Sequence, residues 1–320
     1  MSTNLMPGVR MWMRRDALVI PAAIIALVAP PLLGAYGQFI YATVLVYFLV
    51  ALSLTILTGF AGQISIGHAG FWAVGAYGSA IVVTHLGAPF PVGIATGLCV
   101  GALFGFLVAL PALRVQGHYL AIATLSFAVL VQQVLFEWES LTGGRKGLAV
   151  PRPVMFGYEF SEDWSYVYLL LAIAVLAALI TRNFRRSHSG QALMALKASP
   201  VAAQVAGVGR ARHLIVAFTV SGALTGLSGA LYAHLIGYLS TDSFTLGVSL
   251  TFLSMAVLGG LGSYAGALLG AVYMTLAPEI FREFKQAQML VYGIALILCI
   301  RYLPGGFASI PAVLRGRGAK

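Results

Sequence analysis

Residues 38–57 read QFIYATVLVYFLVALSLTIL, a predominantly apolar run without a charged side chain. An α-helix needs about 20 such residues to cross the hydrocarbon core of a bilayer. The apolar residues are continuous and do not alternate with polar ones, so the run predicts a membrane-spanning helix and not a strand of a closed barrel. The fold expected around it is an all-α, polytopic transmembrane helical bundle.

The composition of the whole chain supports this expectation. Of the 320 residues, 60% are hydrophobic and 9% are charged, whereas about a quarter of the residues in an average soluble domain are charged. Apolar runs along the chain predict about 10 spans, within a range of 8–10. The predicted spans are 17–36, 38–57, 67–87, 91–113, 118–136, 164–181, 213–236, 248–262, 264–279 and 288–303.

The distribution of charge predicts which loops face the cytoplasm. The loop 182–212 carries Arg182, Arg185, Arg186, Lys197, Arg210 and Arg212 and no acidic residue, so the positive-inside rule makes it cytoplasmic. The loop 137–163 has five acidic and three basic residues and is predicted to lie outside. With an even number of spans, both termini are then cytoplasmic. Basic cytoplasmic loops therefore account for the net charge of +10, and nucleic acid is not expected as a partner.

The sequence lacks the residue patterns of an enzyme. A phosphate-binding P-loop needs Lys followed by Ser or Thr, but the four lysines precede Gly147, Ala198, Gln286 and the chain end. We find no nucleophile paired with a base and no set of metal ligands, so no catalytic residue, metal or cofactor is assigned to this chain. A transport component without its own ATPase site is expected.

Three features in or next to the spans are interpreted individually. Glycines recur every fourth residue at Gly97, Gly101 and Gly105 and at Gly262, Gly266 and Gly270. This spacing favours tight helix packing over contact with a substrate. The polar residues Gln63, His68, Gln132 and Gln133 are candidates for a translocation path, although hydrogen bonds between helices are the commoner use of such groups. Asp242 is interpreted as the N-cap of the helix that follows it.

The stretch 189–209, SGQALMALKASPVAAQVAGVG, predicts two short helices outside the spans. The first covers 190–198. Ser199 and Pro200 then form a helix start, and Gly207 ends the second helix after 200–206. A helix this short is marginal in water by itself. It must pack on its own bundle, on the membrane surface or in a socket on a partner protein, and its arginines flank it without lining one face, which favours the socket.

Several blocks of the chain resemble one family, the branched-chain amino acid (LivM-type) permeases of bacterial ABC importers. Their cytoplasmic loop carries two alanines and a glycine four residues after the second, and Ala202, Ala203 and Gly207 stand in that register. Importer permeases more widely often have Glu before the two alanines, where this chain has Val201. The other similar blocks are LTGFAGQISIGHAGFWAVGAY, GHYLAIATLSFA, LTGGRKGL, YLSTDSFTLGVSL, AVLGGLGSYAGALLGA and YLPGGF.

The resemblance implies a single type II-like transmembrane permease domain over residues 1–320, in the bacterial inner membrane. It implies three kinds of partner: a homologous permease subunit, two cytoplasmic ATPase subunits that bind ATP and Mg, and a periplasmic substrate-binding protein. The loop 182–212 would be the coupling loop. The residues expected to couple it to the ATPase are Gly190, Ala195, Ser199, Pro200, Ala202, Ala203 and Gly207.

The periplasmic loop and the substrate are the remaining expectations. Arg145 and Lys146 in the loop 137–163 are candidates for docking the binding protein, with a solvated turn as the alternative. The resemblance implies leucine, isoleucine or valine as substrate. Related permeases for urea or short amides, and a secondary transporter or channel that works without ATP, are the alternatives.

Overall fold

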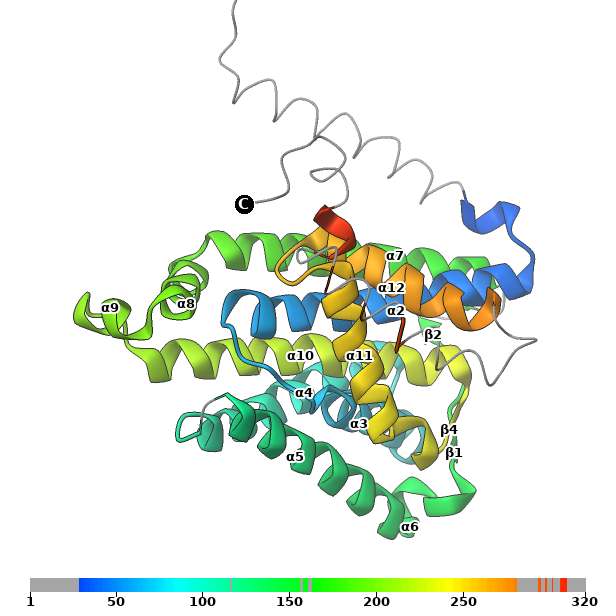
Figure 1. Cartoon of the computed structure of the whole chain (residues 1–320). Coiled ribbons are helices and arrows are strands. Elements are labelled where there is room, and N and C mark those ends of the chain that lie inside the picture. Colours follow the sequence, from blue (N-terminus) through cyan, green and yellow to red (C-terminus); the bar gives the residue numbers. More distant parts are fainter. Residues whose placement is uncertain are drawn as a thin grey trace, which may run out of the picture.

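The computed structural model describes residues 29–115, 117–155, 158–160, 163–280, 293–294, 297, 301 and 306–309. Long helices lie side by side and form a bundle (Figure 1). They are α2 (Ala35–Leu54), which continues into the π-helical η1 (Thr55–Phe60), α3 (His68–Leu86), α4 (Phe90–Ala112), α5 (His118–Glu137), α7 (Asp163–Arg186), α10 (Arg210–Ile236), α11 (Leu246–Gly259) and α12 (Tyr264–Ile280).

Short elements connect the long helices at their ends. At one end are α8 (His188–Ala198) and α9 (Pro200–Val205); toward the other are α6 (Glu139–Thr142), η2 (Gly144–Lys146), β1 (Leu148–Ala149), β2 (Val154–Met155), β3 (Tyr158–Glu159), β4 (Tyr238–Leu239) and η3 (Thr241–Phe244). Strand β1 pairs antiparallel with β4, and β2 pairs antiparallel with β3. A last short helix, η4, covers Phe307–Ser309.

Six helices among the described residues are long and apolar enough to cross a membrane. They cover the predicted spans 38–57, 67–87, 91–113, 118–136, 164–181 and 213–236. Helix α7 continues to Arg186, past its predicted end, because hydropathy falls at the arginines although the helix does not stop there. Helix α11 is shorter, with 14 residues, and the predicted span 288–303 lies mostly outside the described residues.

The start of the chain also differs from the prediction. Residues 1–28 lie outside the described part, and the described remainder of the predicted span 17–36 is not one helix. Residues 29–32 are helical, the chain bends at 33–34, and α2 begins at Ala35. Gln38 stabilises this bend, because its side-chain amide donates to the carbonyl oxygens of Pro30 and Leu33 at 3.1 and 2.9 Å.

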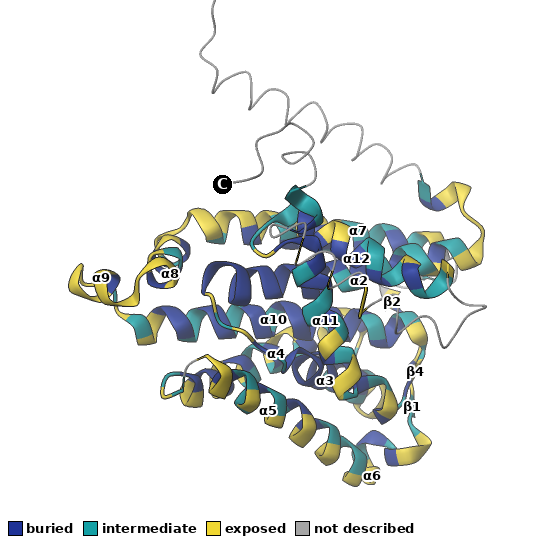
Figure 2. Ribbon diagram, in the orientation of Figure 1, coloured by how far each residue is buried: buried dark blue, intermediate teal, exposed yellow. Residues whose placement is uncertain are grey.

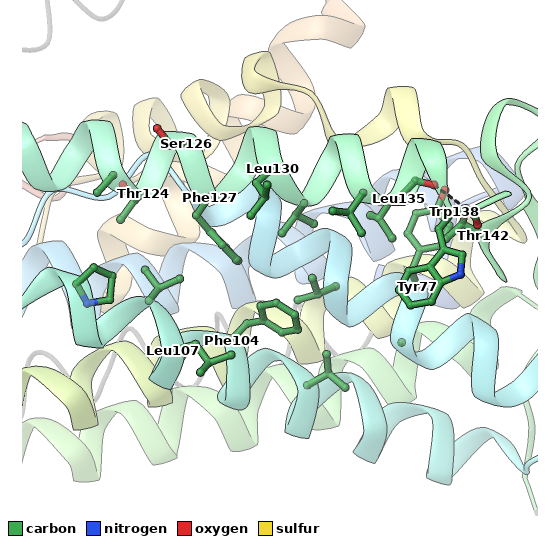
Figure 3. Close-up of a pocket in the computed structure, with 18 of the residues that line it drawn as sticks. Tyr77, Phe104, Leu107, Thr124, Ser126, Phe127, Leu130, Leu135, Trp138 and Thr142 are labelled. Atoms are coloured by element: carbon green, nitrogen blue, oxygen red, sulfur yellow. Dashed lines mark hydrogen bonds between the residues drawn. The ribbon is translucent and has the colours of Figure 1, made fainter. Parts of the chain in front are cut away.

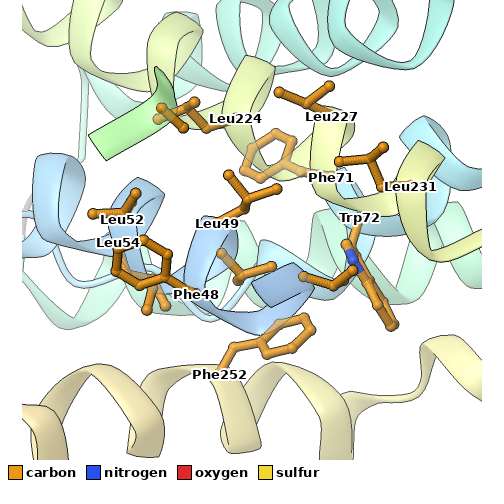
Figure 4. Packing of buried hydrophobic residues seen from close by; sticks show 14 of the residues in the cluster. Phe48, Leu49, Leu52, Leu54, Phe71, Trp72, Leu224, Leu227, Leu231 and Phe252 are labelled. Atoms are coloured by element: carbon orange, nitrogen blue, oxygen red, sulfur yellow. The ribbon is translucent and has the colours of Figure 1, made fainter. Parts of the chain in front are cut away.

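Helices α2 and α10 form the centre of the bundle. In each, 67% of the most apolar stretch is buried, compared with 28–33% in α4, α5 and α7, and Figure 2 shows the exposed outer faces of α5 and α7. Figure 4 shows side chains of α2, α3, α10 and α11 that pack in this centre: Phe48, Leu49, Leu52, Leu54, Phe71, Trp72, Leu224, Leu227, Leu231 and Phe252. The outer helices α4, α5 and α7 therefore leave most of their apolar residues uncovered within the described chain.

Glycines bring α4 and α10 into backbone contact. We call Gly97, Gly101 and Gly105 of α4 with Gly222 and Gly226 of α10 the glycine seam. A Cβ atom on Gly226 would lie 2.4 Å from the carbonyl oxygen of Gly97, and one on Gly101 would lie 2.4 Å from that of Gly222. No side chain fits at these distances, so the tight-packing interpretation of this glycine ridge is confirmed.

The second predicted ridge is only partly a helix interface. Gly266 and Gly270 of α12 press against Gly259 and Met255 of α11. Gly262 lies in the turn between these helices with a φ of +84°, and it faces Gly59 at the end of η1. The sequence spacing grouped Gly262 of the turn with Gly266 and Gly270 of α12, because the three follow one another at intervals of four residues.

Candidate functional site

Helices α8 and α9 form an arm that projects from one end of the bundle, opposite the β1–β4 ladder (Figure 1). The hydroxyl oxygen of Ser187 accepts from the backbone N–H of Gly190 at 3.3 Å and caps α8. Ser199 caps α9 in the same way, accepting from the N–H of Ala202 at 3.3 Å, and Pro200 follows as the first helical residue. Both short helices and the Ser199–Pro200 start are confirmed.

The surface of α9 is apolar and exposed. Val201 and Val205 lie one turn apart with 74% and 86% of their surface exposed. On the opposite face Ala203 is buried, and the helix ends before Gly207, whose φ is +84°. Apart from its two neighbours in the chain, no described residue lies within 4 Å of the place where a Gly207 Cβ would stand. The face therefore has no cover within the described chain.

The other predicted coupling residues lie at the base of the arm or on its surface. Gly190 is buried, and a Cβ atom there would lie 2.1 Å from the carbonyl oxygen of Phe184, so the turn from α7 into α8 requires glycine. Ala195, Ser199, Pro200 and Ala202 are exposed. Leu193 and Leu196 of α8 are buried and fix the base of the arm to the bundle.

Between η1 and α3 the chain leaves the helical conformation. We call residues 61–67 the break. Its deep end is held by hydroxyl groups of other helices: Ile66 N–H donates to Thr124 Oγ1 of α5 at 3.0 Å, and Ala69 N–H just beyond it donates to Ser249 Oγ of α11 at 3.1 Å. In membrane transporters, irregular backbone of this kind occurs where it is buried in protein or lines a path. The predicted spans 38–57 and 67–87 left residues 58–66 outside any helix, and the break lies almost entirely there. The hydroxyl groups of Thr124 and Ser249 that hold it were not predicted.

The four candidate path residues are not brought together. Gln63 lies in the break, half-buried, and its amide donates to the Ala61 carbonyl oxygen at 3.0 Å. His68 is buried between Ser65 and Ser221, 3.2 Å from each hydroxyl oxygen. Gln132 and Gln133 lie further along α5, where Gln133 donates to Glu137 at 2.9 Å. Gln133 is about 13 Å along the helix from Thr124, which touches the break.

A cavity of 830 Å³ lies between α3, α4 and α5. Its walls are apolar, and Figure 3 shows Phe104 and Leu107 of α4 with Phe127 and Leu130 of α5 around it. Thr124 also lines it and so joins the cavity to the break. Tyr77 is 1% exposed, and its hydroxyl has no hydrogen-bond partner among the described residues. The cavity can hold an aliphatic group, and the hydroxyl-bearing residues along its lining are Tyr77, Thr124, Ser126 and Thr142.

Arg145 and Lys146 lie in a firmly anchored turn at the opposite end of the bundle. Both side chains are exposed, and the Arg145 guanidinium lies 5.0 Å from the centre of the Phe136 ring. The Lys146 carbonyl oxygen accepts from the Tyr238 hydroxyl. Gly143, Gly144 and Gly147 have positive φ angles between +50° and +74°, so glycine sets the shape of this turn.

The assignment of Asp242 as an N-cap is wrong. Asp242 is exposed within η3, and its own N–H donates to Ser240 Oγ at 3.3 Å. Helix α11 begins after Thr245, which makes no side-chain capping hydrogen bond. Ser240 caps first because its hydroxyl reaches the N–H two residues on, which turns the chain before Asp242 can cap a helix.

These features define a class: a multi-pass helical membrane protein with an arm outside the bundle. Comparison with known proteins shows which family within this class the chain belongs to. The family described as "Branched-chain amino acid transport system / permease component" matches residues 38–300. The chain belongs to this family of membrane permeases, and the similarity expected from its motifs is confirmed.

The most similar relatives include transport subunits of enteric bacteria. The chain is 32% identical to the high-affinity branched-chain amino acid permease protein LivM of Salmonella typhimurium over 317 residues, covering 91% of this chain and 75% of the relative. Identity to the Escherichia coli LivM protein is 31% with the same coverage. The E. coli LivH protein is 24% identical over 83% of this chain and 92% of its own length. No solved structure matches the chain.

Proposed function

We propose that this chain is a permease subunit of a binding-protein-dependent ABC importer for branched-chain amino acids. In this role it pairs with a homologous permease in the bacterial inner membrane, with about 10 spans and both termini in the cytoplasm. Two ATPase subunits bind ATP and Mg, and a periplasmic binding protein delivers leucine, isoleucine or valine. The chain itself carries no ATPase site and moves substrate by alternating access.

The exposed valines of α9 are the observation that carries this proposal. Val201 and Val205 project from a six-residue helix at the tip of the arm. A six-residue helix has little stability of its own, and a paired apolar surface at the tip of a projecting arm needs a partner. A groove on an ATPase subunit provides such a partner, and movement of that groove then reaches the bundle through α8.

The cavity beside the break favours branched-chain amino acids over urea or short amides. Its lining is apolar apart from a few hydroxyl groups. An aliphatic side chain gains free energy on entering such a space, about 0.8 kcal/mol per buried methylene group. Urea has no apolar part and would lose hydrogen bonds to water there.

The experiment is ATPase activity of the assembled complex in lipid nanodiscs, with binding protein loaded with leucine, valine, urea or an acyl amide. We expect stimulation by leucine- or valine-loaded binding protein. Stimulation only by urea-loaded binding protein would show that the complex imports urea and not branched-chain amino acids. A chain that assembles with no ATPase and still transports leucine would be a secondary transporter or channel, and the proposal would be wrong.

A further inference from the structure

One lysine joins the arm to the break. Lys197 lies in the last turn of α8, and its Nζ donates to the carbonyl oxygen of Gly59 at 2.7 Å. Gly59 belongs to η1, which runs directly into the break. The aliphatic part of the same side chain covers Gly62, where a Cβ atom would lie 2.9 Å from Lys197 Cγ. Lys197 therefore contacts the end of η1 through its ammonium group and the start of the break through its aliphatic stem.

The contact point is closely packed on its other side. A Cβ atom on Gly59 would lie 2.7 Å from both the N and the Cα of Gly262, in the turn between α11 and α12. Displacement of the Gly59 carbonyl therefore pushes on that turn as well. A helix end leaves carbonyl oxygens without backbone partners, and an ammonium group on a flexible stem can follow one of them as it moves.

The far end of the break is fixed to different helices. Thr124 of α5 accepts from Ile66 N–H, and Ser221 of α10 contacts the ring of His68. Between these two anchored ends, Gly62 and Ile64 are exposed, and Gly62 has a φ of +68° that favours glycine. The break is thus held at its shallow end by the arm and at its deep end by the bundle, with a glycine hinge next to the lysine.

We propose that Lys197 is the positioning residue that transmits movement of the arm to the break, and through it to the transport path. The inference rests on the proposed function, because the arm moves only if an ATPase holds it. A hydrogen bond from a charged donor changes an equilibrium by about tenfold or more. Without Lys197, the complex should therefore still hydrolyse ATP, but hydrolysis should no longer change the conformation of the break.

The test uses the complete complex in nanodiscs and proteoliposomes, with Cys99 and Cys299 replaced by serine and Ile64→Cys added as a reporter. Labelling of position 64 by a membrane-impermeant maleimide is measured without nucleotide and after trapping with ATP and vanadate. Substrate taken up per ATP hydrolysed is measured in parallel in the background that keeps Ile64. The variants are Lys197→Met, Lys197→Arg and, as a control for loss of charge in the same loop, Arg212→Met.

We expect ATP trapping to change the labelling rate in the parent complex and in Lys197→Arg and Arg212→Met. In Lys197→Met the change should be lost, with ATPase activity retained and uptake per ATP lowered about tenfold. A Lys197→Met complex that responds like the parent would overturn the inference, as would a fall in uptake and hydrolysis in equal proportion. If the parent assembles with no ATPase, the proposed function itself fails, and this inference fails with it.

Discussion

The glycine seam and the arm are both rich in glycine and alanine, but their glycines do opposite things. In the seam, glycine removes side chains so that α4 and α10 meet through their backbones. In the arm, Gly207 stands in open space, and its value is the left-handed conformation that ends α9. The seam holds parts of one chain together, whereas the arm leaves an apolar face uncovered. Substitutions in the glycine seam should therefore damage folding, whereas substitutions in the arm should damage transport.

The largest effect is expected from Gly226→Leu. Gly226 meets Gly97, Gly101 and Gly75, and a Cβ atom on Gly75 would lie 2.2 Å from the Gly226 carbonyl oxygen. A leucine side chain forces the helices apart, and overpacking of this kind costs about 1–3 kcal/mol and occasionally more. Size-exclusion chromatography in detergent should show aggregate instead of a monodisperse peak. Gly34→Ala, at a position with open space around it, is the control and should behave like the parent.

Gly207→Trp should have the opposite profile. A non-glycine residue at this φ costs about 1–2 kcal/mol, but the position is exposed and the cost is confined to the tip of the arm. We expect a monodisperse protein with a melting temperature close to that of the parent and strongly reduced uptake. Failure to fold would show that the arm is part of the structural core, and unchanged uptake would show that its tip docks nowhere.

A smaller and more selective effect is expected from Gly78→Leu in the apolar cavity. A Cβ atom on Gly78 would lie 3.5 Å from Val100, an ordinary contact, so the larger side chain can extend into the cavity. Uptake of leucine should fall several-fold, with the KM rising more than the maximal rate falls. Gly78→Ala is the matched control. Equal uptake by the leucine variant would place the substrate elsewhere.

The smallest effect is expected at the turn that carries Arg145 and Lys146. Exposed charge pairs contribute about 0.2–1 kcal/mol each, so Arg145→Glu with Lys146→Glu should raise the concentration of binding protein needed for half-maximal ATPase stimulation a few-fold. The maximal rate should not change. If the half-maximal concentration also stays the same, the turn is a solvated surface and the binding protein docks on other residues.

Much of the fold could be predicted from the sequence because burial in lipid imposes long apolar runs. Six predicted spans and the two arm helices are present, and the signals were hydropathy and the Ser199–Pro200 helix start. Hydropathy placed residues 58–66 between two spans, and the break at 61–67, which contains Gln63 and Ser65, lies almost entirely there. Hydropathy could not predict how the break is held. Its position depends on hydroxyl groups from Thr124 and Ser249, which lie on other helices and are far away in sequence.

In the candidate site, the features formed by residues close together in sequence could be predicted. The contacts between residues far apart in sequence could not. The cap and the terminating glycine of α9 are relations between neighbours in the chain, and both are found. The link from Lys197 to Gly59 joins residues far apart in sequence, and no spacing rule indicates it. The glycine ridge at Gly97, Gly101 and Gly105 predicted close packing but not its partner, because spacing defines a face of one helix and says nothing of the helix opposite.

The most direct test of the account is site-specific photo-cross-linking from Val205. A photoreactive residue at this position, in the purified permease reconstituted with its ATPase subunits, should form a covalent adduct with an ATPase subunit. The same residue at Leu103, which is 54% exposed on α4, should form none. We expect the Val205 adduct to contain the ATPase subunit. Adducts from Val205 only to lipid or to the permease itself, in a complex that hydrolyses ATP, would contradict it.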